Sequence, residues 1–456
     1  LNVSVGNFLI GMYAEWQSLD EARKIFDGLK HKDEMSWGIM LAAYIYDGID
    51  LMTLDLFRDD MRLLPGRSMF VCTLKACNRM GSIEQGRLIH FQVIRTGFET
   101  DLVVGNTLID MYVKFGLLAE AQDVLDKLPI RGIVAWTALI TGYVDQGLCG
   151  EAIKCFRKML DERFSPNSVT FTCILKACGS LGLLEKGEEI HDKVQKEGLV
   201  GSSIMLDNAL VDMYAKCGAF AKARRAFDEL PVRGVISWTA LITGYAQHGH
   251  SDEALDCFRS MKEDGLSPDA VTFCSILKAC SMIGSTAKGK EIHAEARNRG
   301  LLTANVVLGN ALVDMYAKCG VLAKAQEVFD ELPVRDVVGW TSLISGYSQL
   351  AHVERVFTLF YRMIAEGIIP NSVTFVVLLT ACSHSGLVEE GRTYFDVITT
   401  SYCLNPTLEH YNCMVDLFGR AGHFDNAKAL LDKMPHLPLF SSILGACRKW
   451  KNVVLG

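Results

Sequence analysis

The stretch Asn310-Ala-Leu-Val-Asp-Met-Tyr-Ala-Lys-Cys-Gly320 occurs twice in this chain. The same eleven residues stand 102 positions earlier, at Asn208–Gly218. A close relative of this stretch, Asn106–Gly116, lies another 102 positions back, and weaker copies begin at Asn7 and Asn412. Eleven identical residues at one long interval do not recur by chance, so the sequence indicates a repeat protein.

The 102-residue period is composite. One cycle contains three blocks, which begin at Ile133, Ser168 and Ile204 and have the lengths 35, 36 and 31. The cycle then recurs downstream, with block starts at Val235, Ala270, Val306, Val337, Ser372 and Leu408. A slightly shortened cycle precedes it, with block starts at Glu34, Arg67 and Leu102. The chain therefore holds about 13 blocks of three alternating types.

Each block is predicted to form two helices. In the block from Ile133, Leu139, Ile140 and Tyr143 form one apolar stripe at helical spacing, and Gly147 breaks that helix. A second apolar stripe follows, and Pro166 ends the block. Because neither helix can bury its stripe alone, neighbouring blocks must stack. The predicted fold is all-α, a superhelical α-solenoid of helix-turn-helix repeats of about 31–36 residues.

Composition agrees with a long, continuous core. Of the 456 residues, 50% are hydrophobic, and the formal net charge is −7, which argues mildly against a simple polyanion-binding surface. Several of the 15 cysteines recur once per cycle, as at Cys178, Cys280 and Cys382. This recurrence predicts buried packing residues in a reducing compartment rather than a disulfide framework. No run of 18 apolar residues occurs, so no transmembrane helix is expected.

Two families of helical hairpins share this repeat length. Tetratricopeptide repeats have a uniform unit of about 34 residues and bind protein segments. The alternation of block lengths 35, 36 and 31 instead resembles the P, L and S motifs of plant PLS-class pentatricopeptide repeat proteins, which act in RNA editing. The residue patterns are similar too: Trp238–Tyr245 resembles P motifs, Phe273–Cys280 resembles L motifs, and the stretch at Asn310 resembles S motifs.

The resemblance covers nearly the whole chain. It implies an array of alternating P, L and S motifs over residues 1–438, followed over 439–456 by the start of a truncated E-like motif. The junction Pro435–Phe440 is several residues shorter than the family pattern. Because the chain begins at Leu1 and has no clear ending, it is interpreted as a fragment of a longer protein.

The family resemblance implies modular reading of single-stranded RNA, about one nucleotide per motif. The fifth and the last residue of a motif would read the base, and an aliphatic residue at the second position would pack beside it. The implied base-packing residues are Val134, Ile236 and Val338. The implied base-reading residues are Asn7, Asp33, Asn106, Thr137, Asn167, Thr172, Ser203, Asn208, Thr239, Asp269, Asn305, Asn310, Asp336, Thr341 and Asn371.

The same resemblance implies a preference for each pair. Thr with Asn favours adenine, as at Thr137/Asn167; Thr with Asp favours guanine, as at Thr239/Asp269; and Asn with Asp favours uracil, as in the pair of Asn310 with Asp336. Where Asn faces Gly, at Asn106 and Asn208, a weaker pyrimidine bias is expected. Most L motifs lack a polar fifth residue, and the motif from Glu34, with Gly38 and Gly66, is expected to read nothing.

No catalytic centre is expected within these residues. His293-Ala-Glu295 and His352-Val-Glu354 match half of the zinc site of a cytidine deaminase, but the sequence contains no Cys-x-x-Cys to complete it. His293 also recurs as His191 and His90 in the other L motifs, which indicates a structural role. We therefore expect no enzyme, no cofactor and no metal ligands here.

The sequence thus predicts a sequence-specific binder of single-stranded RNA in a mitochondrion or chloroplast, which selects sites for C-to-U editing. The deaminase would come from a missing C-terminal segment or from a deaminase-bearing or other editing-complex protein. Two alternatives remain open. The chain could serve RNA stability, splicing or translation, or it could be a protein-binding helical-repeat scaffold.

Overall fold

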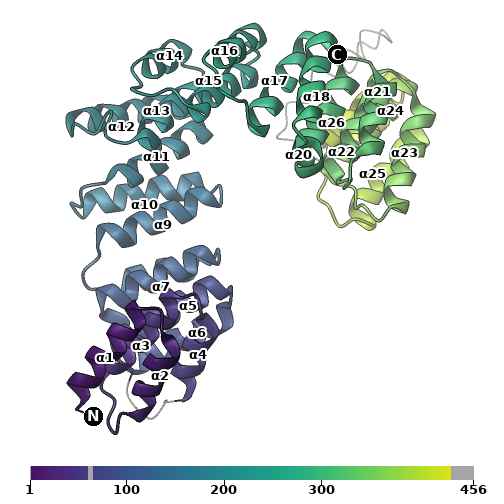
Figure 1. Cartoon of the computed structure of the whole chain (residues 1–456). Coiled ribbons are helices and arrows are strands. Elements are labelled where there is room, and N and C mark those ends of the chain that lie inside the picture. Colours follow the sequence, from purple (N-terminus) through teal and green to yellow (C-terminus); the bar gives the residue numbers. More distant parts are fainter. Residues whose placement is uncertain (1, 60–64, 433–456) are drawn as a thin grey trace. The chain divides into compact units, whose positions relative to one another are not determined.

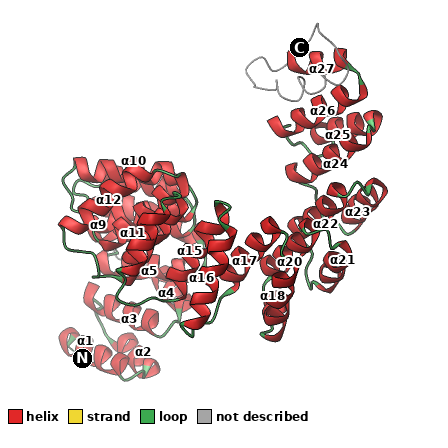
Figure 2. Ribbon diagram, turned by 90° about the horizontal axis from the view of Figure 1, so that it is seen from above, coloured by secondary structure: helices red, strands yellow, loops and turns green. Residues whose placement is uncertain are grey.

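The computed structural model describes residues 2–59 and 65–432, and within them the regular structure is entirely helical (Figures 1 and 2). The all-α repeat fold predicted from the sequence is confirmed. The chain divides into two compact units, Leu1–Val232 and Arg233–Gly456, which are described separately below. No helix in the described ranges is long and apolar enough to cross a membrane.

Each unit is a series of helical hairpins. The helices of the first unit are α1 (Val3–Glu15), α2 (Leu19–Gly28), α3 (Glu34–Tyr46), α4 (Asp50–Asp59), α5 (Arg67–Met80), α6 (Ile83–Arg95), α7 (Leu102–Lys114), α8 (Leu118–Lys127), α9 (Ile133–Asp145), α10 (Cys149–Asp161), α11 (Ser168–Leu181), α12 (Leu184–Lys196), α13 (Ile204–Lys216) and α14 (Phe220–Asp228). A short 3₁₀ helix, η1 (Phe98–Thr100), precedes α7.

The second unit continues the pattern. Its helices are α15 (Val235–Gln247), α16 (Ser251–Glu263), α17 (Ala270–Ile283), α18 (Thr286–Asn298), α19 (Leu301–Ala304), α20 (Val306–Lys318), α21 (Leu322–Glu331), α22 (Val337–Gln349), α23 (Val353–Ala365), α24 (Ser372–Ser385), α25 (Val388–Thr400), α26 (Leu408–Ala421) and α27 (Phe424–Asp432). Every block start inferred from the sequence is the first residue of a helix in one of the two units.

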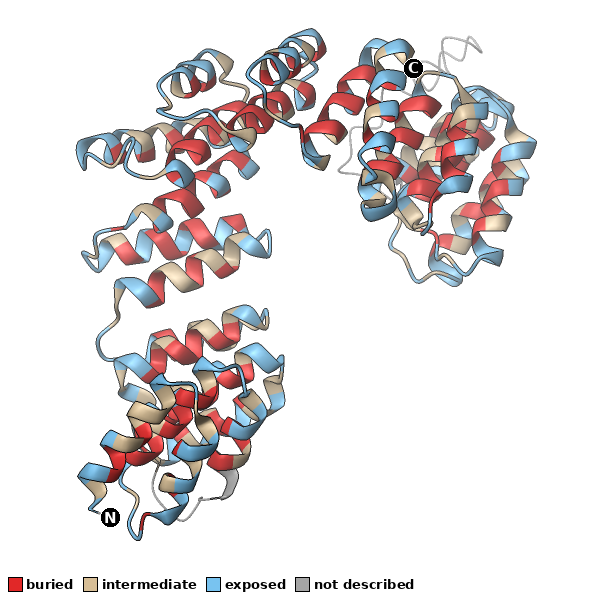
Figure 3. Ribbon diagram, in the orientation of Figure 1, coloured by how far each residue is buried: buried red, intermediate tan, exposed pale blue. Residues whose placement is uncertain are grey.

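Within each unit the hairpins form two layers. The first helix of each motif packs on the first helix of the next, as α20 does on α22 and α22 on α24. The second helices lie behind this layer, and each packs on its own first helix and, in most motifs, also on the following one, as α23 does on α22 and α24. Buried residues concentrate between the two layers (Figure 3). One face of each unit is therefore lined by first helices; we call it the first-helix face.

Residues that recur in the stretch at Asn310 have identifiable roles in packing and in ending the helix. Tyr316 is fully buried on α20 and its Oη lies 3.1 Å from Nδ1 of His293 on α18. Met315 packs against Gly289 so closely that a Cβ at Gly289 would lie 2.4 Å from the Met315 methyl group. Gly320 has φ of +75°, the left-handed conformation that ends a helix at low cost for glycine.

The same contacts recur in the first unit. His90 Nδ1 lies 2.7 Å from Tyr112 Oη, and His191 Nδ1 lies 2.8 Å from Tyr214 Oη. The equivalent close approaches to glycine are those of Met111 to Gly86 and Met213 to Gly187. The repeat therefore encodes one packing arrangement between the second helix of an L motif and the first helix of the next S motif.

The cysteines behave as the sequence predicts. All those in the described ranges are free thiols, and most of them are buried or half-buried. Burial raises the pKa of Cys155 and Cys382 to about 12 and that of Cys178 and Cys280 to about 11. Such thiols stay protonated near neutral pH and pack as small apolar groups. The predicted E-like motif at 439–456 lies outside the described residues.

Candidate nucleic-acid interface

A row of exposed aliphatic side chains runs along the first-helix face of each unit. Val134, Ile236 and Val338, the predicted base-packing residues, are 64%, 69% and 53% exposed. The same second position is also apolar and exposed in the P motif from Glu34, at Met35, and in most L and S motifs, at Val103, Val169, Met205, Val271, Val307 and Val373. Only Val134, Ile236 and Val338 were predicted from the sequence. Exposed apolar side chains repeated on one face indicate a surface that a ligand covers.

In the first unit this face contains a measurable hollow. A pocket of about 750 Å³ lies over α3, α5 and the start of α7. It is lined by second-position residues (Met35, Ser68, Val103), fifth-position residues (Gly38, Val71) and the motif-ending Asp33, among others. Second, fifth and last positions therefore share one surface. The pocket is open where the fifth residue is Gly38, which has no side chain to fill it.

In the P motifs, a hydroxyl of the next motif joins the predicted pair. Thr137 Oγ1 lies 2.8 Å from Thr170 Oγ1, and Thr170 Oγ1 lies 2.9 Å from Oδ1 of Asn167. The Thr170 backbone N–H also donates to this Oδ1 at 2.9 Å. The fifth and last residues of the motif are therefore connected through the third residue of the following motif, on α11.

The other two P-motif pairs have the same geometry. Thr239 Oγ1 lies 2.7 Å from Thr272 Oγ1, which donates to Asp269 Oδ1 at 2.7 Å. Thr341 Oγ1 lies 2.9 Å from Thr374 Oγ1, which donates to Asn371 Oδ1 at 3.0 Å. We call Thr170, Thr272 and Thr374 the linking threonines. They are fully buried, and sequence reasoning did not single them out. Their recurrence at one block position was the available signal.

Two S-motif pairs are joined directly. Asn7 Nδ2 donates to Asp33 Oδ1 at 3.0 Å, and Asn310 Nδ2 donates to Asp336 Oδ1 at 2.8 Å. The two differ at the third residue of the next motif. Ser36 Oγ lies 2.6 Å from Asn7 Oδ1 and 2.7 Å from Asp33 Oδ1, so its one hydrogen is shared between the two oxygens. Gly339, in contrast, leaves Asn310 Oδ1 buried without a hydrogen-bond partner.

The remaining predicted residues are not joined in this way. Asn106 lies on α7, in a motif whose last residue is Gly132, and its Oδ1 is buried without a hydrogen-bond partner. Thr172 donates instead to the Ser168 carbonyl on its own helix, at 2.8 Å. Ser203 and Asn305 begin α13 and α20 as N-caps, and Asn305 Oδ1 accepts from Leu308 N. Asn208 is buried on α13 in the first unit. Gly234 lies in the second unit and is the N-cap of α15.

The last residue of a motif is always the N-cap of the next first helix. Asp33, Asn167, Asp269, Asp336 and Asn371 each accept a hydrogen bond from a backbone N–H in the first turn that follows. Asn and Asp are both favoured caps, so capping alone explains why one of them is present. It does not decide between them. Each cap bond uses Oδ1, which leaves the second polar atom of the side chain for a ligand.

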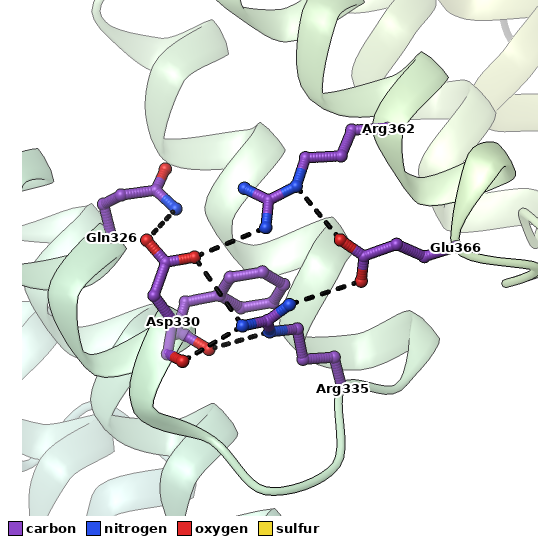
Figure 4. Close-up of polar contacts among 6 residues, drawn as sticks. Gln326, Asp330, Arg335, Arg362 and Glu366 are labelled. Carbon is purple, nitrogen blue, oxygen red and sulfur yellow. Dashed lines mark hydrogen bonds and ion pairs between the residues drawn. The ribbon is translucent and has the colours of Figure 1, made fainter.

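An arginine holds the loop that carries Asp336 (Figure 4). Arg335 donates to the carbonyls of Phe329 and Asp330 at the end of α21, at 3.3 and 3.0 Å, and pairs with Glu366 after α23 at 3.4 Å. Arg362 also pairs with Glu366, at 3.0 Å. Arg131 makes the matching contacts before Gly132 in the first unit. This clamp fixes the backbone from which the last residue projects.

The charges on this face differ between motif types. The ninth position, one turn beyond the fifth, is an exposed lysine in three L motifs: Lys75, Lys176 and Lys278. In S motifs the same position is an aspartate that forms an ion pair with a basic side chain four residues later, as Asp314 does with Lys318 at 2.7 Å.

Hydrogen bonds from the Ser36 backbone, the Ser36 hydroxyl and Asn7 lower the pKa of Asp33, so it stays a carboxylate.

The histidine of the half-matched deaminase motif is structural. His293 is buried on α18 against Tyr316, and its pKa is lowered chiefly by burial and further by nearby Arg297 and Lys324. Glu295 pairs with Lys262 and Arg299, each at 2.7 Å. Among the described residues, no cluster of histidine, cysteine, aspartate and glutamate could hold a metal ion.

Comparison with known proteins gives consistent matches. Models of the PPR repeat family match residues 131–180, 233–282 and 335–384, and models of the PPR repeat match 106–133, 169–199, 208–235, 310–337, 373–403 and 402–435. A putative pentatricopeptide repeat-containing protein of Arabidopsis thaliana is 35% identical over 466 residues, covering 100% of this chain and 67% of the relative.

Two further Arabidopsis thaliana relatives carry an organelle in their names. A mitochondrial pentatricopeptide repeat-containing protein is 35% identical over 99% of this chain and 83% of its own length. A chloroplastic one is 36% identical over 98% of this chain, but this covers only 55% of its own length. The chain thus corresponds to a part of these longer proteins.

Solved structures share the fold. The crystal structure of the pentatricopeptide repeat protein PPR10 from maize matches with a TM-score of 0.58 at 18% identity, over 98% of this chain and 72% of the other. PPR10 in complex with an 18-nt psaJ RNA element matches with a TM-score of 0.61 at 20% identity, over 97% of this chain and 70% of the other.

Proposed function

Since this chain belongs to the pentatricopeptide repeat family, we propose that its first-helix face binds single-stranded RNA and reads chosen bases with the fifth and last residues of its motifs. One observation carries the proposal. A polar fifth residue, a motif-ending Asn or Asp and an exposed second-position aliphatic side chain recur together, as at Thr239, Asp269 and Ile236. The RNA complex of a protein with the same fold supports it.

The parts of each cluster suit an unpaired base. The aliphatic side chain offers an apolar surface to the flat face of the base, and the polar pair offers donors and acceptors to its edge. A base-paired strand would bury that edge, so single strands are favoured. The exposed Lys75, Lys176 and Lys278 lie one turn further along the first helices, where phosphate oxygens of the backbone would complement their charge.

With one nucleotide per motif and the 5′ end at the N-terminus, the predicted tract is 5′-UNNYANYGNUA-3′, where Y is a pyrimidine. The U, A and G positions correspond to Asn7, Thr137, Thr239, Asn310 and Thr341. The tract can be tested by gel shift against a scrambled RNA of equal composition. The proposal expects binding at least tenfold tighter to the predicted tract. Equal binding of the two RNAs would contradict it, and no binding to either would favour a protein-binding scaffold.

We further propose that the protein belongs to the PLS class and selects sites for C-to-U editing in a plant mitochondrion or chloroplast. The alternating block lengths of 35, 36 and 31 and the organelle names of its relatives support this. The deaminase would be carried by a further segment or by a partner. In plants without the protein, editing should fail at a cytidine beside the tract. Unchanged editing with altered transcript level or splicing would instead favour a stability or splicing factor.

A further inference from the structure

We propose that the third residue of the following motif is a positioning residue for base recognition. It fixes which atoms the fifth and last residues present to the RNA. This inference rests on the proposed base reading and adds a third determinant to it. The residues concerned are the linking threonines Thr170, Thr272 and Thr374, all fully buried and therefore outside direct contact with a ligand.

Each threonine hydroxyl has a single hydrogen to donate. Asp269 Oδ1 is a carboxylate oxygen and can only accept, so the Thr272 hydroxyl hydrogen is used at the 2.7 Å contact with it. The hydrogen in the 2.7 Å contact between Thr239 and Thr272 must then come from Thr239. Thr239 consequently turns its hydrogen inward and its lone pairs outward. The link converts a hydroxyl that can donate or accept into an acceptor.

The Asn pairs work in the same way. The Thr170 backbone N–H donates to the Asn167 side chain at 2.9 Å, so the amide atom in that place is the oxygen. The Thr170 hydroxyl therefore donates to it as well, and Thr137 supplies the hydrogen in its contact with Thr170. Because the cap and the link both use Oδ1, the amide nitrogen of Asn167 is left for the RNA base as a donor.

The two pairs thus present different patterns. Thr137 with Asn167 presents an acceptor and a donor, which complements adenine, whose edge carries the N6 amino donor and the N1 acceptor. Thr239 with Asp269 presents two acceptors, because the cap and the link use only Oδ1 and leave the second carboxylate oxygen for the base. Two acceptors complement guanine, whose edge carries the N1–H and N2 amino donors. Without the linking hydroxyl, threonine could donate to adenine N1 as readily as it accepts from guanine N1–H.

Replacing Thr272 with valine tests the link, because valine keeps the shape and removes the hydroxyl. Four RNAs that differ only at the eighth nucleotide of the tract, opposite Thr239, are compared by equilibrium binding. The wild-type protein should prefer guanine to adenine by about tenfold, and Thr272→Val should reduce this to about twofold, the loss of about one hydrogen bond. Thr272→Ser keeps a hydroxyl and should retain the wild-type preference.

A matched control is Thr73→Val. The Thr73 hydroxyl is equally buried but bonds only to carbonyls of its own helix, Met69 at 2.8 Å and Phe70 at 3.1 Å. This variant should keep all base preferences. In Thr272→Val, preference at the fifth nucleotide, opposite Thr137, should also stay unchanged. If Thr272→Val fails to fold, Thr374→Val provides the same test at the eleventh nucleotide.

The outcomes separate the two proposals. An unaltered preference for guanine in a folded Thr272→Val variant would overturn the role of the linking hydroxyl while leaving base reading intact. A wild-type protein without preference at the eighth nucleotide would overturn base reading and this inference together. A general weakening of Thr272→Val for all four RNAs, with the guanine-to-adenine ratio kept, would show a merely structural role and also overturn the inference.

Discussion

At the last position of each motif, one side chain serves both the fold and the proposed interface. Asn371 caps α24 through Oδ1, which accepts from Thr374 N and from the Thr374 hydroxyl, both at 3.0 Å. Its amide nitrogen is not needed for the cap. Aspartate could make the same cap, as Asp269 does for α17. The choice between the two residues is therefore free to follow the ligand rather than the helix.

Asn310, the fifth residue of an S motif, has no hydroxyl of the next motif beside it. Asn310 Oδ1 is buried and unpartnered because the third residue of the next motif is Gly339. Gly339→Ser should supply the donor that Ser36 supplies to Asn7, and it also removes a glycine from a helix. Because any Cβ at this position displaces the Asn310 amide, the donor is measured against Gly339→Ala, and we expect the serine variant to be more stable by about 1 kcal/mol, with a higher urea midpoint.

Gly339→Ala is the matched control for that change. Either residue places a Cβ 2.6 Å from Asn310 Oδ1, so the Asn310 amide must shift in both variants. Alanine gains at least as much helix propensity as serine, but it brings no donor. It should be clearly less stable than the serine variant. Equal stability of the two variants would show that the orphaned oxygen costs nothing.

At the scale of the element, the loop between an S motif and a P motif is held by its arginine. Arg335→Ala should loosen the loop carrying Asp336 and so weaken the cap, whose bonds from Val338 N and Gly339 N measure 3.0 and 2.9 Å. These two amides should exchange hydrogen about tenfold faster, the effect of losing one to two hydrogen bonds. Arg259→Ala removes an exposed pair on α16 and should leave them unchanged. Equal exchange in both variants would contradict the clamp.

The histidine between an L and an S motif makes packing depend on pH. Burial lowers the pKa of His293 below its value of about 6.5 in the unfolded chain. The unfolded state then binds the proton more readily, so stability is complete above about pH 6.5 and falls as the pH drops towards the folded pKa. We expect the urea midpoint to fall between pH 7.0 and 5.5, and to fall less in His293→Asn.

The slope will not vanish in that variant, because burial also lowers the pKa of His90 and His410. Replacement of the exposed His31 by asparagine is the control and should keep the wild-type slope. If His293→Asn and His31→Asn lose stability identically on acidification, the buried histidine is not the cause.

Much at this scale could be predicted from the sequence. Block starts such as Ile133 and Ser168 could be found because period, stop residues and apolar stripes all mark the same boundaries. The linking threonines could not, because the partners of Thr170 lie 33 residues earlier, at Thr137, and three residues earlier, at Asn167. Only the stacking of neighbouring motifs brings those positions together. Periodicity predicts which residues are equivalent, but not which of them touch.

At the scale of the whole molecule, the net charge of −7 contrasts with the proposed polyanionic ligand. The exposed lysines on the first-helix face supply positive charge where the RNA backbone is proposed to lie. Lys176→Ala and Lys278→Ala should each weaken binding of every RNA alike and reduce the slope of log affinity against log salt by about 0.7, the value for one phosphate contact on a single strand. Base preferences should stay the same.

Lys154→Ala is the control for these lysines. Lys154 lies on the second helix α10 and pairs with Glu151 at 2.7 Å, away from the first-helix face. Its loss should leave the salt slope unchanged. Should Lys154 matter as much as Lys176 and Lys278, the RNA would not be confined to the proposed face.

The central claim is that the pair of fifth and last residues reads one base, and exchanging Asn and Asp between two motifs tests it most directly. Asn371→Asp and Asp269→Asn keep both helix caps and change only the outward atom. Binding is measured to RNAs with A or G at the eleventh and eighth nucleotides. We predict that the first variant changes its preference from adenine to guanine at the eleventh nucleotide, and that the second changes from guanine to adenine at the eighth. Unchanged preferences at both positions in folded variants would contradict the account.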